Sequence, residues 1–160
     1  MSKMLMIYPN KCTGCRNCEL ACSFEKEGSF RPGASRVHTL TWEREGFSVP
    51  LMCQQCDDAA CVSVCPTGAM HYGPAGSNLV ELNRDLCIGC KLCVIACPFG
   101  SARYDSVTKS VAKCDTCAGA PQCVEMCPNG ALEFVDDAEQ TRSRKQAVAE
   151  KFKTIFEDVR

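Results

Sequence analysis

Sixteen cysteines occur in this 160-residue chain, and every one belongs to a group of four closely spaced cysteines. The quartets are Cys12, Cys15, Cys18 and Cys22; Cys53, Cys56, Cys61 and Cys65; Cys87, Cys90, Cys93 and Cys97; and Cys114, Cys117, Cys123 and Cys127. The first and third follow C-x2-C-x2-C-x3-C, a spacing that holds a 4Fe–4S cluster and sends its fourth thiolate to a neighbouring cluster. The other two quartets lengthen one gap. Four quartets predict four 4Fe–4S clusters, and a small chain with four clusters is predicted to transfer electrons.

Two other uses of cysteine fit this pattern less well. Disulfide frameworks belong to secreted proteins, and the short apolar stretch at residues 4–7 does not have the length of a signal peptide. Zinc is the stronger alternative, because C-x2-C pairs also bind zinc. A tetrahedral zinc site uses two such pairs, however, and would leave over the third cysteine of the first and third quartets. Iron–sulfur clusters are therefore the preferred interpretation.

Proline follows three of the four closing cysteines, at Pro66, Pro98 and Pro128. A residue before proline is pushed out of helical geometry into an extended conformation. We therefore expect these closing cysteines to leave their helical turns and reach away from their own quartets. Cys22 precedes Ser23 instead, so this expectation is weakest for the first quartet.

Glycine directly precedes the second cysteine in two quartets, at Gly14 and Gly89. Glycine adopts conformations closed to other residues and lets the backbone aim N–H groups at sulfur. Such donors help to set the reduction potential of a cluster.

Short apolar runs separated by turn residues predict three hairpins. Their strands are expected at 37–42 and 47–49, at 71–72 and 79–82, and at 103–104 and 111–112. Aromatic residues make up only 7% of the chain, so the clusters are expected to supply most of the core.

Charge and hydropathy exclude several other classes of protein. With 18 basic and 19 acidic residues the net charge is −1, which predicts no nucleic-acid surface. No apolar stretch approaches the roughly 18 residues of a transmembrane helix. His38 and His71 are isolated and suggest no catalytic site, so the chain is not expected to be an enzyme by itself. Reduced thiols and the absence of a visible leader favour the cytoplasm.

The order and spacing of the quartets resembles the four-cluster ferredoxin subunits of the dimethyl-sulfoxide-reductase iron–sulfur family. The resemblance covers residues 1–135 and includes Cys-Gln-Gln-Cys at 53–56 and Lys-Cys-Asp-Thr-Cys at 113–117. It implies an α+β fold of two bacterial double-cluster ferredoxin-like modules. Module A would combine residues 1–30 with 106–135, and module B would span residues 50–105.

The resemblance also implies that the quartets exchange their closing cysteines. The implied ligand sets are Cys12, Cys15, Cys18 and Cys127 for cluster 1; Cys114, Cys117, Cys123 and Cys22 for cluster 2; Cys53, Cys56, Cys61 and Cys97 for cluster 3; and Cys87, Cys90, Cys93 and Cys65 for cluster 4.

Similar subunits serve formate dehydrogenases, hydrogenases, carbon monoxide dehydrogenases and tungsten-containing aldehyde oxidoreductases. The compact chain, with its segments 12–24 and 30–37, looks most like the small polyferredoxin subunit that accompanies the tungsten enzymes. The expected partners are a catalytic subunit containing tungsten or molybdenum and a flavin subunit. The alternatives are a free soluble polyferredoxin and the electron-transfer subunit of a formate dehydrogenase, hydrogenase or carbon monoxide dehydrogenase.

The last segment, 136–160, contains no cysteine, glycine or proline. Apolar residues at helical spacing predict a helix over 138–159. This helix would either lie back on the ferredoxin core or dock a partner, which could be a catalytic subunit or a second copy of the chain.

Overall fold

The computed structural model describes residues 3–74 and 79–136, where short strands alternate with short helices. The strands are β1 (Lys3–Ile7), β2 (His38–Trp42), β3 (Phe47–Leu51), β4 (Met70–Tyr72), β5 (Val80–Leu82), β6 (Arg103–Asp105), β7 (Ser110–Ala112) and β8 (Leu132–Asp136). The α-helices are α1 (Asn17–Glu27), α2 (Ala60–Ser63), α3 (Leu92–Ala96) and α4 (Gln122–Glu125), and the 3₁₀ turns are η1 (Pro9–Lys11), η2 (Pro32–Ala34) and η3 (Thr116–Gly119). No helix in these two ranges has the length and apolar character needed to cross a bilayer. The predicted helix over 138–159 lies outside the described residues.

The three predicted hairpins are present as antiparallel pairs of neighbouring strands: β2 with β3, β4 with β5, and β6 with β7. The first is longer than predicted, because β3 continues through Pro50 and Leu51 and reaches His38 on the partner strand. Proline is tolerated here because a strand in a two-stranded sheet has a free edge where no N–H is needed.

A fourth pair joins the two ends of the described chain. β1 runs antiparallel to β8, from Lys3 opposite Asp136 to Ile7 opposite Leu132. Leu5 and Met6 are buried in this pair. In the sequence the apolar run at 4–7 is visible, but nothing near it in the chain indicates its strand partner.

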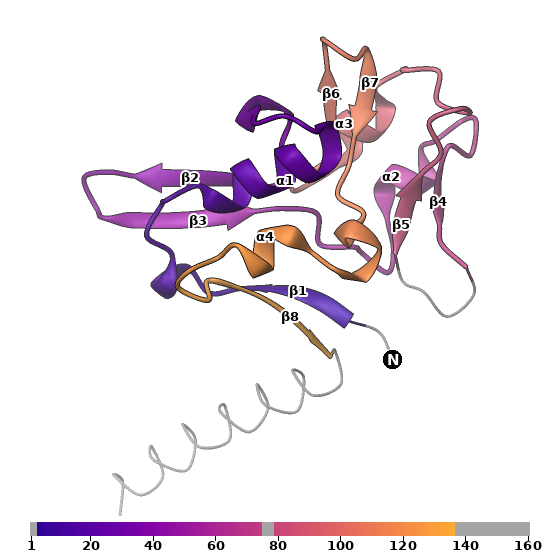
Figure 1. Ribbon diagram of the computed structural model, residues 1–160. Helices are drawn as coiled ribbons and strands as arrows, with labels where there is room; N and C mark the ends of the chain where they lie inside the picture. The colour runs from indigo at the N-terminus through magenta and orange to yellow at the C-terminus, as the bar shows by residue number, and fades with distance from the viewer. Residues whose placement is uncertain (1–2, 75–78, 137–160) are drawn as a thin grey trace, which may run out of the picture.

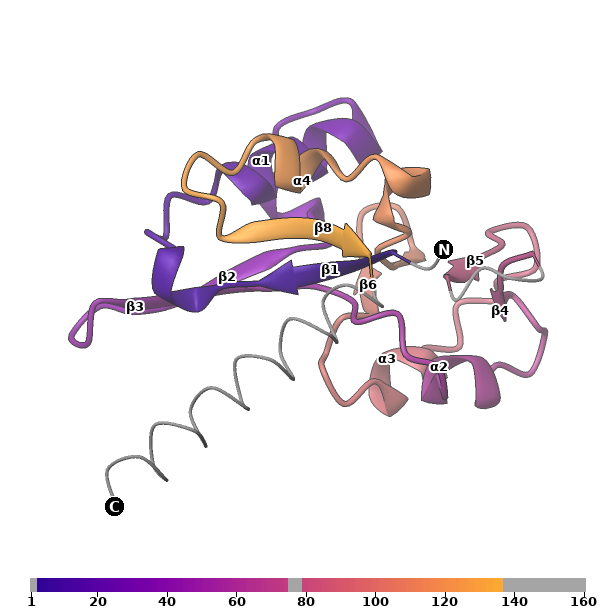
Figure 2. The ribbon, with the colours of Figure 1, turned by 90° about the horizontal axis from the view of Figure 1, so that it is seen from below.

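The elements gather in two groups (Figures 1 and 2). The elements near the chain ends, β1, β8, α1 and α4, lie together, and α1 packs against α4. The elements of the middle segment, α2, α3, β4 and β5, lie to one side of them, and α2 packs against α3. Each group thus contains two packed helices that carry cysteines, together with antiparallel strands.

Helices α1 and α3 begin in the same way. Each follows a basic residue in the left-handed region, Arg16 with φ 60° and Lys91 with φ 65°. Both residues stand between the second and third cysteines of their quartets, so the two C-x2-C-x2-C loops turn alike. Helix α1 then continues through Cys22, whereas α3 ends before Cys97, which is extended (φ −75°, ψ 113°). Cys97 therefore leaves its helix as predicted, whereas Cys22 stays within its own.

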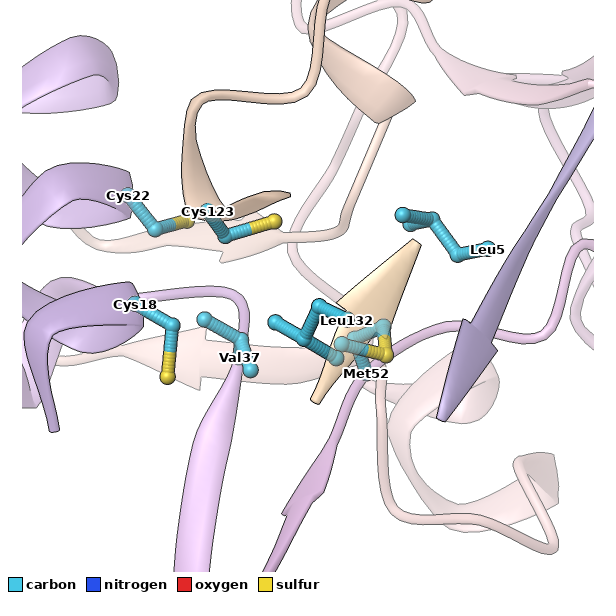
Figure 3. Packing of buried hydrophobic residues seen from close by; sticks show 7 residues of the cluster. All are labelled: Leu5, Cys18, Cys22, Val37, Met52, Cys123 and Leu132. Carbon is cyan, nitrogen blue, oxygen red and sulfur yellow. The ribbon is translucent and has the colours of Figure 1, made fainter. Parts of the chain in front are cut away.

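The buried core is small and contains cysteines. One cluster consists of Leu5, Cys18, Cys22, Val37, Met52, Cys123 and Leu132 (Figure 3). A second consists of Ala59, Met70, Val80, Cys93 and Val111. Methionine, leucine and valine are among the largest fully buried side chains. The apolar core therefore lies directly against the cysteine side chains.

Candidate iron–sulfur sites

Three cavities are each lined by four cysteines. The empty space in them, part of which is open to solvent, is about 320, 310 and 330 Å³. The cysteine sets are, in that order, Cys12, Cys15, Cys18 and Cys127; Cys87, Cys90, Cys93 and Cys65; and Cys53, Cys56, Cys61 and Cys97. Each cavity thus combines three cysteines of one quartet with the closing cysteine of another.

The remaining four cysteines also lie near one another. Cys22 and Cys123 share the first core cluster, where Figure 3 shows them side by side, and Cys114 packs against that cluster. Burial raises the pKa of the Cys117 thiol, and the nearby Cys22 adds to that rise. Cys22 therefore lies with the first three cysteines of the fourth quartet, although it comes from the first.

The residue before the second cysteine has a positive φ in all four quartets. The angles are 71° at Gly14, 49° at Gln55, 68° at Gly89 and 53° at Thr116. From the sequence only the two glycines could be identified, because glutamine and threonine seldom adopt this conformation. Their presence in the left-handed region shows that the loop geometry is common to the four quartets and overrides the preference of the residue.

Every closing cysteine accepts a backbone N–H on its sulfur. The donor–sulfur distances are 3.2 Å for Arg36 to Cys22, 3.3 Å for Met70 to Cys65, 3.3 Å for Ser101 to Cys97 and 3.2 Å for Ala131 to Cys127. N–H groups aimed at sulfur are what a cluster-bound thiolate requires, since they stabilise its negative charge.

Three of these four bonds come from one repeated turn. In the Cys-Pro-x-Gly segments the glycine N–H bonds back to the cysteine carbonyl, and Gly68, Gly100 and Gly130 all have positive φ. The chain is thereby folded back over the sulfur. The repeated Cys-Pro-x-Gly segment thus presents N–H groups to the sulfur of its closing cysteine.

The electrostatic surroundings differ between the cysteines. Burial raises the pKa of the Cys114 thiol to about 12. At Cys97 burial also disfavours the thiolate, but N–H groups led by that of Ala102 outweigh it and lower the pKa. The N–H groups led by that of Met70 lower the pKa of Cys65 in the same way, against the effect of burial. A buried set of thiolates needs compensating positive charge, and the iron ions of a cluster supply it, so these residues fit the cofactor that the sequence predicts.

The disulfide and zinc alternatives can be compared with the described residues, 3–74 and 79–136. All sixteen cysteines lie in this part of the chain, and all are free of disulfide bonds. Within residues 3–74 and 79–136, no group of three or more histidine, cysteine or acidic side chains is arranged to hold a single metal ion.

Two polar residues at these sites, Gln55 and Lys113, were not identified as functional from the sequence. Gln55 Nε2 donates to the Cys114 carbonyl over 2.8 Å, and Lys113 Nζ donates to Gln55 Oε1 over 3.1 Å. Both stand inside the two motifs that carry the family resemblance. Their position inside these motifs could have drawn attention to both residues. Only the folded structure, however, shows that the two side chains meet.

Residues 45–137 match the family described as a 4Fe-4S dicluster domain, and residues 9–25 match a 4Fe-4S binding domain. The polyferredoxin-like subunit of an aliphatic sulfonate oxidoreductase from Pyrococcus furiosus is 43% identical over 111 residues, which cover 69% of this chain and 63% of the relative. A component of the anaerobic dimethyl sulfoxide reductase of Escherichia coli is 36% identical over 121 residues, which cover 68% of this chain and 58% of the relative.

This chain thus matches about three fifths of the length of these curated relatives. Among solved structures, a chain of the BamBC active-site complex of benzoyl coenzyme A reductase has a similar fold. The TM-score is 0.50 at 24% identity, with 92% of this chain and 89% of that chain covered. The expected family resemblance is confirmed: the chain belongs to the 4Fe-4S dicluster domain family.

Proposed function

We propose that this chain is an electron-transfer subunit of a larger oxidoreductase and that it binds four 4Fe–4S clusters. The observation that carries the proposal is the crossed lining of the three cavities, each with three cysteines from one quartet and a closing cysteine from another. Such clusters supply one-electron oxidation and reduction. The contribution of the chain is to hold the thiolates, to direct N–H groups at them and to surround them with apolar side chains.

The proposed ligand sets are the four that the family resemblance implies. The three cavities support the sets completed by Cys127, Cys65 and Cys97, and the proximity of Cys22 to the fourth quartet supports the remaining one. The proposed modules are residues 1–30 with 106–135, and residues 50–105. The packing of α1 on α4 and of α2 on α3 supports this division.

We propose a catalytic subunit as the permanent partner. Two relatives are named as a polyferredoxin-like subunit of an aliphatic sulfonate oxidoreductase and as an iron-sulfur subunit of an arsenate respiratory reductase. These names support an assembly with a catalytic oxidoreductase subunit. That this subunit contains tungsten or molybdenum is what the family resemblance implies, and a tungsten aldehyde oxidoreductase is the specific proposal. A flavin subunit and docking through residues 136–160 belong to the same proposal. So does a cytoplasmic location, since free thiols persist in reducing compartments.

The test is anaerobic purification of the tagged chain from the organism that encodes it, with analysis of iron, sulfide and heavier metals. Tungsten or molybdenum that co-elutes with a large subunit is the expected result. Nickel would instead indicate a hydrogenase or carbon monoxide dehydrogenase. Iron and sulfide in an isolated monomer would favour a free polyferredoxin. Zinc in a colourless protein would contradict the electron-transfer proposal itself.

A further inference from the structure

Lys113 is a buried lysine with uncharged hydrogen-bond partners. Only 8% of the residue is exposed. Its ammonium group donates to Gln55 Oε1 over 3.1 Å, to the Cys114 carbonyl over 2.9 Å and to the Val80 carbonyl. In the part of the chain that the structure describes, no carboxylate forms an ion pair with it. A buried ammonium is unfavourable unless opposite charge lies nearby, so the site needs a source of negative charge.

The position of Lys113 identifies that source. The residue lines the cavity that contains Cys53, Cys56, Cys61 and Cys97, and it directly precedes Cys114. Its ammonium group also bonds to the backbone of Cys114 itself. One ammonium group thus adjoins the proposed site of cluster 3 and lies beside Cys114, a proposed ligand of cluster 2, and the two sites are assigned to different proposed modules.

Gln55 fixes the ammonium group in place. Its Oε1 accepts from the Val80 N–H over 2.9 Å as well as from Lys113, and its Nε2 donates to the Cys114 carbonyl over 2.8 Å. These bonds orient the side-chain amide with its oxygen toward the lysine. The left-handed conformation of Gln55 (φ 49°) belongs to the same arrangement, because it lies in the loop that carries Cys53 and Cys56.

We propose that Lys113 is a positive charge shared by cluster sites 2 and 3, which raises the reduction potentials of both bound clusters. The inference rests on the proposed ligand sets. A cluster gains one negative charge when it is reduced, so a nearby cation stabilises the reduced form. An electron passing between clusters held at the two sites would oxidise one and reduce the other, with no bond broken and no proton transferred. A cation near both sites would raise both potentials.

The test compares the full-length wild-type chain with Lys113→Met and Lys113→Arg, all purified anaerobically. Iron and sulfide per chain are measured first, followed by a redox titration monitored by electron paramagnetic resonance. Lys113→Met is expected to retain iron but to shift two midpoint potentials to more negative values, whereas Lys113→Arg is expected to stay near the wild type. Lys109→Met is the matched control, because Lys109 is exposed in the turn between β6 and β7.

A second variant tests the charge while the lysine is retained. Gln55→Glu places a carboxylate against the ammonium group and is expected to lower the same two potentials. Unchanged potentials in iron-replete Lys113→Met and Gln55→Glu would overturn the inference and leave the proposed function intact. Loss of iron from both variants and from Lys113→Arg would assign a purely structural role to Lys113 and would also overturn it. A wild-type chain without iron and sulfide would overturn the proposed function instead.

Discussion

The backbone N–H of Arg36 donates a hydrogen bond to Cys22 Sγ over 3.2 Å, across fourteen positions of the sequence. The other closing cysteines receive this bond from the turn that follows them. Cys22 cannot, because it lies inside helix α1. The segment before β2 therefore supplies the N–H group that a following turn supplies elsewhere. Contacts that fix the position of Arg36 consequently also support the Cys22 thiolate.

Glu27 is that support, and its charge is expected to matter. Arg36 Nη2 lies 2.7 Å from Glu27 Oε1, and the Arg36 side chain is only 3% exposed. Glu27→Gln removes the charge but keeps an acceptor, which is expected to cost about 2 kcal/mol. Because cluster loss is irreversible, the measurement is the rate at which the visible absorption bleaches at a fixed temperature. We expect an increase of about thirtyfold.

Glu25→Gln is the matched control, since Glu25 is exposed on the same helix. Equal bleaching rates in the two variants would show that the Glu27–Arg36 pair does not support the cluster site.

The crossed ligand sets predict which cysteine variants should resemble each other. Cys97→Ser is expected to abolish the same paramagnetic signal as Cys53→Ser, because both are assigned to cluster 3. Cys87→Ser, from the same quartet as Cys97, should abolish a different signal, the one lost in Cys65→Ser. Iron content should fall by one cluster in each variant. Identical spectra for Cys97→Ser and Cys87→Ser would instead mean that each quartet binds its own cluster.

An ion pair connects helix α1 with the loop of the fourth quartet. Lys26 Nζ lies 2.7 Å from Asp115 Oδ1, and Asp115 Oδ1 also accepts from the Cys117 N–H over 3.1 Å. Because Asp115 is about half exposed, the pair is expected to contribute about 1 kcal/mol, or roughly fivefold in bleaching rate. A double-mutant cycle with Lys26→Met and Asp115→Asn measures this coupling. If the effects of the two single substitutions on the bleaching rate simply add in the double variant, the two residues are not coupled.

The same pair gives a pH dependence of known sign. Burial by itself would raise the pKa of Asp115, but the hydrogen bonds from Lys26 and from the Cys117 N–H, together with the positive charge of Lys26, outweigh it and the pKa is lowered. The stabilisation is therefore fully present above the ordinary aspartate value of about 3.9 and is lost as the pH falls through the lower value of the folded state. In Asp115→Asn this part of the acid sensitivity should be absent.

The sequence was sufficient for the local features of the fold and insufficient for the long-range ones. The hairpins around residues 43–46, 73–79 and 106–109 follow from turn residues between short apolar runs, a signal carried by neighbours in the chain. The β1–β8 pair joins segments more than a hundred residues apart, and an apolar run at 4–7 does not specify its partner. Helix α1 continues through Cys22, where no proline follows the cysteine, and the expectation that closing cysteines leave their helices was weakest at this position.

For the site, the ligands could be identified from spacing, but their supporting residues could not. Gln55 and Thr116 occupy left-handed positions against their own preference, because the surrounding loop imposes them. Burial of Lys113 likewise contradicts the general rule that lysine stays in water. Such exceptions can be recognised only when the surrounding residues, here Gln55 and the Val80 carbonyl, are known.

Two loop glycines with the same conformation should differ in their tolerance of alanine. Gly14 and Gly89 both have positive φ, so alanine costs about 1–2 kcal/mol at either position. A Cβ at Gly14 would lie 2.8 Å from Ser48 Oγ, whereas the nearest atoms at Gly89 are 3.9 Å away. Gly14→Ala must therefore displace the Ser48 side chain and its 3.1 Å hydrogen bond to Thr41. We expect Gly14→Ala to bleach faster than Gly89→Ala.

The contact with Ser48 can be separated from the backbone strain. Adding Ser48→Ala to Gly14→Ala removes the hydroxyl group that a Cβ would meet, so the bleaching rate should return toward that of Gly89→Ala. Ser48→Ala alone reports the loss of the hydrogen bond to Thr41. If Gly14→Ala and Gly89→Ala bleach at the same rate, the close approach of Ser48 does not constrain the first cluster loop, and strain alone explains the glycine.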